Sequence, residues 1–118
     1  MTLPVLNLMP GDMPFRVDPK NSYTLPARFY HDPQIWEAEK DAIFYKTWFY
    51  AGHVSQVAEP GQFLTVRIHD QNVCVARTRT GDLNAFYNVC PHRGHELVSG
   101  TGKKNIITCP YHAWAFDF

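Results

Sequence analysis

The sequence predicts a mainly β protein in which an antiparallel sheet follows an extended arm and one α-helix. Three features of the chain support this fold class. Prolines recur throughout residues 1–31, and apolar residues recur at roughly helical spacing over residues 31–48. After Trp48, apolar residues tend instead to recur at every second position. Proline interrupts helices, whereas repeats of about 3.6 and 2 residues are typical of amphipathic helices and half-buried strands. We therefore expect an arm and a helix in residues 1–48 and a β domain in residues 49–118.

The predicted helix lies in the stretch HDPQIWEAEKDAIFYKTW, residues 31–48. Asp32 has a side chain suited to the N-cap, and Pro33 would occupy the first helical position, where its missing N–H costs no hydrogen bond. The apolar side chains of this stretch predict a stripe that packs against a core. They are Ile35, Trp36, Ile43, Phe44 and Trp48.

The predicted strands are short segments in which apolar residues alternate or form short runs. They are residues 62–70, 72–79, 83–89 and 105–108. The first two are separated by a short turn at Asp70–Gln71 and predict a hairpin. The third would run directly into Cys90 and the fourth into Cys109. The GTGKK stretch at residues 100–104 is expected to be a solvated, glycine-rich turn.

Composition and charge exclude several classes of protein. The formal net charge is zero, so no basic surface indicates a nucleic-acid partner. No apolar run approaches the roughly 18 residues of a membrane span, and the N-terminus lacks the basic and apolar parts of a secretory signal. A cytoplasmic protein with no membrane partner is therefore expected. The three cysteines are an odd number, which argues against a disulfide framework and favours metal binding.

The strongest chemical signal is a pair of Cys/His motifs, each just past a predicted strand. Cys90 and His92 are separated by one residue. Sixteen residues lie between His92 and Cys109, and Cys109 and His112 are separated by two. Thiolate and imidazole are good ligands for zinc and for iron. A structural zinc site is one interpretation, but the first pair is tight for a single ion, and structural zinc more often uses Cys-x-x-Cys. The side chains of residues two positions apart in a loop point in different directions, so they suit two neighbouring ions better than one. Each motif would then give its Cys to one iron and its His to the other.

The stretches CPHRGH (90–95) and CPYHAW (109–114) resemble the Rieske iron–sulfur motif. Residues 23–48 look like the arm and helix that precede this domain in α-subunits of Rieske non-haem iron oxygenases. The motif regions look most like those of the carnitine, betaine and choline oxygenases. The resemblance implies a Rieske-type antiparallel β-sandwich with a cluster-binding subdomain and a [2Fe-2S] cluster. Its ligands would be Cys90 and Cys109 on one iron and His92 and His112 on the other.

Further residues of the motifs are expected to support the cluster: Arg93, Gly94, Tyr111 and Trp114. Gly94 would permit a tight loop with backbone N–H groups close to sulfur. Tyr111 and Trp114 would shield the cluster, although ordinary core packing explains them nearly as well, and Arg93 is as readily a surface residue. The remaining histidines and cysteine, which are His31, His53, His69, His95 and Cys74, are expected to be ordinary structural residues, with Cys74 buried.

The resemblance also implies an electron path through a larger assembly. A reductase or ferredoxin would supply electrons, and His112 would hydrogen-bond an acidic residue of a neighbouring subunit in a homo-oligomer of trimer type. The acceptor would be a mononuclear Fe(II) held by two His and one carboxylate. Only AWAFDF follows His112, and the sequence contains no second cluster of this kind, so no catalytic residue is predicted. We therefore expect a truncated α-subunit that lacks the C-terminal strands of the sandwich and the downstream iron domain.

Two alternatives to an oxygenase subunit stay open. A free-standing Rieske ferredoxin-like carrier would transfer electrons without a catalytic domain, and a zinc-binding module would hold its metal for structural reasons alone. The arm and helix ahead of the sheet favour the oxygenase subunit over the small carrier, because such carriers usually begin near their first strand.

Overall fold

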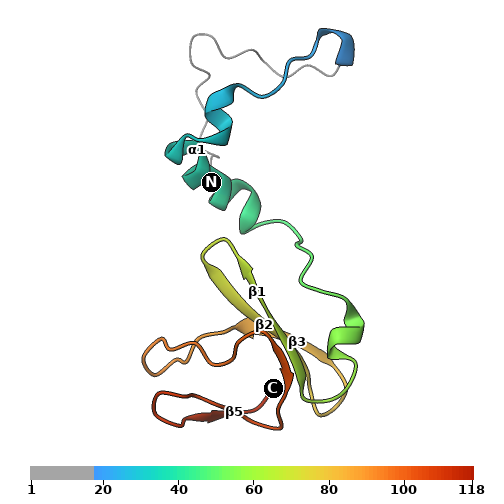
Figure 1. Cartoon of the computed structure of the whole chain (residues 1–118), viewed down its shortest axis with the longest axis vertical. Coiled ribbons are helices and arrows are strands. Elements are labelled where there is room, and N and C mark those ends of the chain that lie inside the picture. The colour runs from blue at the N-terminus through green and yellow to red at the C-terminus, as the bar shows by residue number, and fades with distance from the viewer. Residues whose placement is uncertain (1–17) are drawn as a thin grey trace. The chain divides into compact units, whose positions relative to one another are not determined.

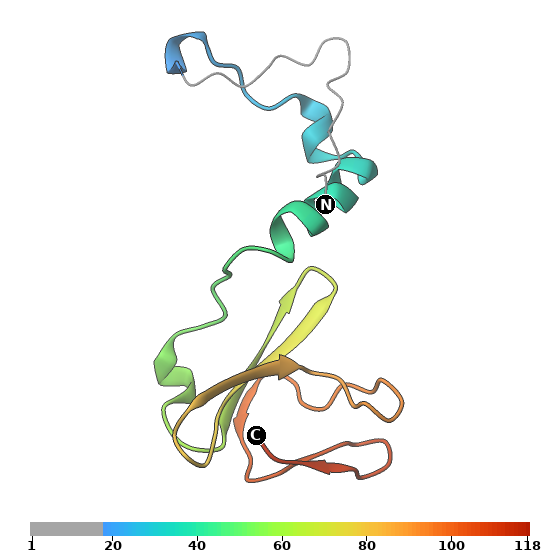
Figure 2. The ribbon, with the colours of Figure 1, turned by 180° about the vertical axis from the view of Figure 1, so that it is seen from behind.

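The structure is a computed structural model, and it describes residues 18–118 (Figures 1 and 2). The chain divides after Thr47 into two compact units. Among the described residues, the first unit contains the α-helix and the second contains the strands. The predicted N-terminal arm falls largely on residues 1–17, which lie outside the described residues.

Helix α1, Pro33–Glu39, begins where the sequence predicts. The Asp32 side chain accepts a hydrogen bond from the Gln34 N–H at 2.9 Å, and Pro33 occupies the first helical position. The helix continues as one π-helical turn, η3, which spans Lys40–Phe44. Two short 3-10 turns precede α1, namely η1 (Pro19–Asn21) and η2 (Ala27–Tyr30).

The predicted apolar stripe of this helix is only partly buried. Ile35 is buried, but Trp36 and Ile43 are exposed, and Trp48 lies beyond the helical turns and is fully exposed. The prediction of a packed stripe is therefore wrong for these three residues. Trp36 directly follows Ile35 in α1, so its side chain points to a different side of the helix. A π turn contains more residues than an α turn, so Ile43 within it rotates out of line with Ile35. Trp36 instead meets Phe44 edge-on, with ring centroids 5.3 Å apart.

The second unit contains a four-stranded antiparallel sheet of order β3-β2-β1-β4 and a two-stranded antiparallel ladder, β5-β6 (Figure 1). The strands are β1 (Gln62–Ile68), β2 (Gln71–Arg77), β3 (Leu83–Tyr87), β4 (Thr101–Lys103), β5 (Ile107–Thr108) and β6 (Ala115–Phe116). A 3-10 turn, η4 (Val54–Val57), precedes β1. The predicted mainly β, antiparallel fold class is confirmed.

Some details of the predicted strands are wrong. The hairpin turn is His69–Asp70, because Ile68 pairs with Gln71, and His69 adopts the left-handed conformation (φ 57°) that favours such a tight turn. Part of the predicted turn at residues 100–104 is strand β4, which pairs with β1 through its backbone while its side chains stay exposed. Strand β3 also ends before it reaches Cys90.

The hydrophobic core joins the two sheets and the loops that follow β3 and β5. Its buried members are Phe63, Cys74, Ala76, Cys90, Leu97, Val98, Ile107 and Cys109. Cys74 is buried as predicted. Two other members, Cys90 and Cys109, are the cysteines of the predicted metal motifs, so packing of the core brings both motifs to one region. No helix within residues 18–118 combines the length and the apolar character needed to cross a membrane.

Candidate metal centre

Two loops carry the predicted motifs. We name residues 90–95 loop one and residues 109–114 loop two. In loop one, the Gly94 N–H donates to the Cys90 carbonyl at 2.8 Å, and the Cys90 N–H donates to the His95 carbonyl at 2.7 Å. The first residue of loop one is therefore bonded through its backbone to both the fifth and the sixth.

Loop two repeats these hydrogen bonds at the same positions. The Ala113 N–H donates to the Cys109 carbonyl at 2.9 Å, and the Cys109 N–H donates to the Trp114 carbonyl at 2.8 Å. The fifth residue of each loop is left-handed, with φ of 70° at Gly94 and 60° at Ala113. The two loops therefore share one six-residue hydrogen-bond frame.

The histidines occupy different positions within this shared frame. His92 is the third residue of loop one, whereas His112 is the fourth residue of loop two. Their rings nevertheless lie together, with centroids 4.7 Å apart and planes at 64°. The unequal Cys-to-His spacing in the sequence is thus a one-residue shift of the histidine between two loops with the same backbone bonds.

The two cysteines form a buried pair at the start of the loops. Cys90 and Cys109 are each 2% exposed, and both belong to the same hydrophobic core cluster. Burial by itself would raise the pKa of the Cys109 thiol. Hydrogen bonds from the backbone N–H groups of Tyr111 and His112 and from Cys90 outweigh that effect and lower this pKa below its ordinary value. Loop two therefore favours the thiolate, which is the form that binds metal.

The two histidines form an exposed pair flanked by aromatic rings. The Trp114 ring stacks on His92, with centroids 4.7 Å apart and planes 2° apart. The Tyr111 ring lies against the His112 ring, with centroids 3.8 Å apart. Each imidazole therefore contacts an aromatic side chain that comes from loop two.

The residues predicted to support the centre take different places in it. Gly94 belongs to the hydrogen-bond frame, Tyr111 and Trp114 contact the histidines, and Arg93 is an exposed side chain of loop one. The remaining histidines outside the loops lie at the end of η2, at the N-cap of η4 and in the hairpin turn; they are His31, His53 and His69.

Sequence reasoning missed several residues of the site. Ala113 and the His95 carbonyl belong to the shared hydrogen-bond frame. Both loops begin with Cys-Pro, and aligning them on this pair places Ala113 opposite Gly94 and His95 opposite Trp114. The buried Asn88, which lies before loop one, is also missed. Its only signal in the sequence is a polar residue between the apolar side chains of Tyr87 and Val89.

The donors present fit a two-iron cluster. Two thiols on one side and two imidazoles on the other match a [2Fe-2S] centre of the type in which two Cys bind one iron and two His bind the other. Within residues 18–118, the structure groups no three His, Cys, Asp or Glu side chains in a way that could hold a single metal ion. The four donors form two pairs, which are the buried thiols of Cys90 and Cys109 and the exposed rings of His92 and His112.

Comparison with known proteins assigns residues 47–118 to a known domain family. Residues 47–118 match the Rieske [2Fe-2S] domain family. Over 103 residues the chain is 50% identical to the carnitine monooxygenase oxygenase subunit of Acinetobacter baumannii, and the match covers 86% of this chain and 28% of that protein. Over 101 residues it is 41% identical to the chloroplastic choline monooxygenase of Amaranthus tricolor, covering 86% of this chain and 23% of that protein.

A solved structure shows the same relationship in three dimensions. The apo form of a quaternary ammonium Rieske monooxygenase superimposes with a TM-score of 0.85 at 47% identity, covering 91% of this chain and 32% of its own. The chain thus spans less than a third of the length of these relatives. The predicted resemblance to the N-terminal region of Rieske oxygenase subunits is confirmed. The chain belongs to the Rieske [2Fe-2S] domain family.

Proposed function

We propose that this chain holds a [2Fe-2S] cluster through its two loops and relays single electrons. Cys90 and Cys109 bind the cluster as thiolates, and His92 and His112 bind it through imidazole nitrogen. When bound, the cluster supplies a reversible one-electron carrier. The observation that carries the proposal is the division of the four donors into a buried thiol pair and an exposed imidazole pair.

This division gives the two sides of the centre different tasks. The thiols belong to the hydrophobic core, and the core excludes water from them. The imidazoles and their aromatic neighbours, Tyr111 and Trp114, are exposed. The exposed imidazole side is therefore where an electron donor or acceptor approaches most closely.

The centre would serve a Rieske-type oxygenase, with residues 49–118 as the cluster domain and residues 1–48 as the preceding arm and helix. The similarity to the carnitine monooxygenase subunit supports this role, because it covers more residues than the stretch 47–118 matched to the domain family. A ferredoxin-like carrier, which would use the same four ligands, does not explain similarity outside that domain.

The proposed assembly includes partners that supply and consume electrons. A reductase delivers them, and a mononuclear Fe(II) in a further domain receives them to hydroxylate a quaternary ammonium compound. The solved structure of one relative is described as revealing inter-subunit electron transfer. A homo-oligomer in which the exposed imidazole side faces a neighbouring subunit is therefore part of this proposal.

Anaerobic reconstitution of the 118-residue chain with iron and sulfide tests the ligands. We expect about two irons and two sulfides per chain, visible absorption, and an EPR signal after reduction. Cys90→Ala and Cys109→Ala should each abolish the cluster. Cys74→Ala is the matched control, because Cys74 is buried in the same core but lies outside both loops, and it should retain the full cluster. A colourless chain that carries zinc would overturn the proposal.

A further inference from the structure

Backbone pairing closes loop two where the chain enters and leaves it. Strand β5 precedes the loop and β6 follows it, and Ile107 pairs with Phe116 while Thr108 pairs with Ala115. The hydrogen bond from the Cys109 N–H to the Trp114 carbonyl continues this ladder into the loop. Regular hydrogen bonds of an antiparallel pair therefore hold the two ends of loop two together.

Loop one has no such ladder. Strand β3 ends at Tyr87, and residues 95–99, where the chain leaves the loop, form no strand. The hydrogen bond from the Cys90 N–H to the His95 carbonyl is present, as in loop two, but strand pairing does not extend it. Another interaction must hold the two ends of loop one together.

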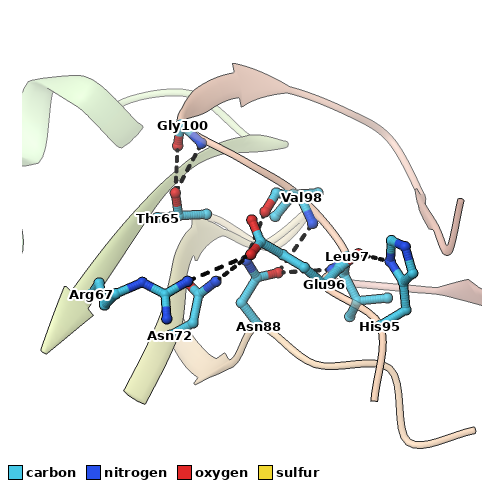
Figure 3. Close-up of polar contacts among 9 residues, drawn as sticks. All are labelled: Thr65, Arg67, Asn72, Asn88, His95, Glu96, Leu97, Val98 and Gly100. Carbon is cyan, nitrogen blue, oxygen red and sulfur yellow. Dashed lines mark hydrogen bonds and ion pairs between the residues drawn. The ribbon is translucent and has the colours of Figure 1, made fainter. Parts of the chain in front are cut away.

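The side chain of Asn88 takes the place of the missing ladder, and Figure 3 shows it directed at the backbone of Leu97 and Val98. Its Nδ2 donates to the Val98 carbonyl at 2.6 Å, and its Oδ1 accepts from the N–H groups of Leu97 at 3.3 Å and Val98 at 3.1 Å. Asn88 is 2% exposed, so these bonds are shielded from water. One side chain thus ties the segment that enters loop one to the segment that leaves it.

Other side chains tie residues in or next to this exit segment (95–99) to different strands (Figure 3). Asn72 of β2 donates through Nδ2 to the Glu96 carboxylate at 2.8 Å, and the Thr65 hydroxyl of β1 accepts from the Gly100 N–H at 2.9 Å. Both contacts are exposed, and neither joins the exit segment to the residues just before Cys90. Asn72 is therefore a matched control for Asn88, being the same residue type bonded to the same segment.

We propose that Asn88 is a positioning residue for the cluster: its buried amide closes loop one and so sets where Cys90 and His92 lie relative to loop two. This inference rests on the proposed ligand role of loop one and adds a residue outside both loops. Removing the amide would leave the Val98 carbonyl buried without its donor, which is costly in a protein interior. Loop one should then open selectively, while the β5-β6 ladder still holds loop two.

The test compares Asn88→Ala and Asn88→Asp with Asn72→Ala in the cluster-loaded 118-residue chain. Asn88→Asp keeps the shape and the oxygen acceptor but removes the Nδ2–H donor, so it serves if Asn88→Ala fails to fold. Hydrogen exchange by mass spectrometry reports the amides of Cys90 and Cys109 separately. We expect exchange at Cys90 to become about tenfold faster or more in the Asn88 variants and to change less than about twofold at Cys109. Asn72→Ala should change neither by more than about twofold.

The EPR spectrum of the reduced cluster is the second measurement. It should shift in the Asn88 variants and stay unchanged in Asn72→Ala. Two exchange results in the Asn88 variants would overturn the inference: equally faster exchange at the Cys90 and Cys109 amides, or unchanged exchange at Cys90. An unchanged EPR spectrum in a variant whose Cys90 amide exchanges faster would also overturn it. If the unsubstituted chain itself shows no Rieske spectrum, the proposed ligands fail. The comparison of the two amides still decides in that case whether Asn88 holds loop one.

Discussion

The ring of Trp114 lies parallel to the ring of His92, with centroids 4.7 Å apart and planes 2° apart. Trp114 belongs to loop two and His92 to loop one, so this stack joins the two loops across the centre. Trp114 is about half exposed. Its indole therefore covers one face of the imidazole without being buried in the core, and it both orients His92 and shields it from water.

Replacing Trp114 with Ala should speed the loss of the cluster. An aromatic stack contributes about 0.5–1.5 kcal/mol beyond the area it buries, so the half-life of the cluster should fall by about two- to tenfold. The decay of visible absorption in air measures this half-life. Trp114→Phe, which keeps an aromatic ring, should retain most of it, and Trp48→Ala, which removes a fully exposed indole outside the loops, should not change it. Equal half-lives for Trp114→Ala and the unsubstituted chain would contradict the shielding role.

The left-handed residues of the two loops predict opposite effects of exchanging glycine and alanine. Gly94→Ala should lower the free energy of unfolding by about 1 kcal/mol, because alanine is strained in this conformation. No atom lies within 4 Å of the added Cβ, so the cost is conformational rather than steric. Ala113→Gly should raise the free energy of unfolding by about 0.5 kcal/mol, because relief of strain outweighs the added entropy of the unfolded chain. Urea unfolding of the loaded chain measures both.

Gly81→Ala provides the control for these exchanges. Gly81 has φ of 91° and no atom within 4 Å of an added Cβ, but it lies in the turn between β2 and β3. Its replacement should destabilise the chain by a similar amount and leave the EPR spectrum of the cluster unchanged. Greater stability of the Gly94→Ala chain would show that the left-handed conformation of loop one is not required.

Replacing His112 with Cys should lower the midpoint potential of the cluster. A third thiolate adds negative charge at the irons. The four-Cys centres of plant-type ferredoxins lie at about −400 mV, whereas Rieske centres lie between about −150 and +300 mV. We expect a decrease of about 100 mV or more in a redox titration, together with a changed EPR spectrum. His95→Cys, another exposed histidine of the loops, should leave both unchanged. An unchanged spectrum in the His112→Cys chain would show that His112 is not a ligand.

The buried Cys74 thiol predicts a loss of stability at high pH. Burial raises the pKa of this thiol from 9.0 to about 11 in the folded chain. The unfolded chain therefore releases the proton at lower pH than the folded chain. The contribution to stability is fully present below about pH 9 and should be lost as the pH rises towards about 11. The measurement is the difference in free energy of unfolding between the unsubstituted and Cys74→Ala chains across this pH range.

Alkylation gives an independent check of the same burial. Iodoacetamide at pH 8 should modify Cys74 only after the chain unfolds, because the thiol is both protonated and inaccessible in the folded state. Equal rates of modification at Cys74 in folded and unfolded chains would contradict its burial.

The elements that the sequence predicts correctly are those specified by near neighbours in the chain. The start of α1 at Asp32 and Pro33 depends on a cap and a first helical turn, and both are local. Strands β1, β2 and β3 are long enough to show their pattern. Strand β5 lies within the predicted strand at residues 105–108 and forms only its last two residues. Strands β4 and β6 contain three and two residues, which is too short for any alternation to be recognised. These short strands exist because of their pairing partners.

The family of this protein can be recognised from its sequence alone, because a family motif is a set of residue types at fixed local spacing. The folded chain is needed to see that the thiols of the two motifs are buried together, that the imidazoles lie exposed together, and that Trp114 covers His92. It also shows that a side chain closes loop one whereas strand pairing closes loop two. Each of these relationships joins segments through hydrogen bonds or core packing, and such contacts between separated segments leave no periodic or spacing pattern in the chain.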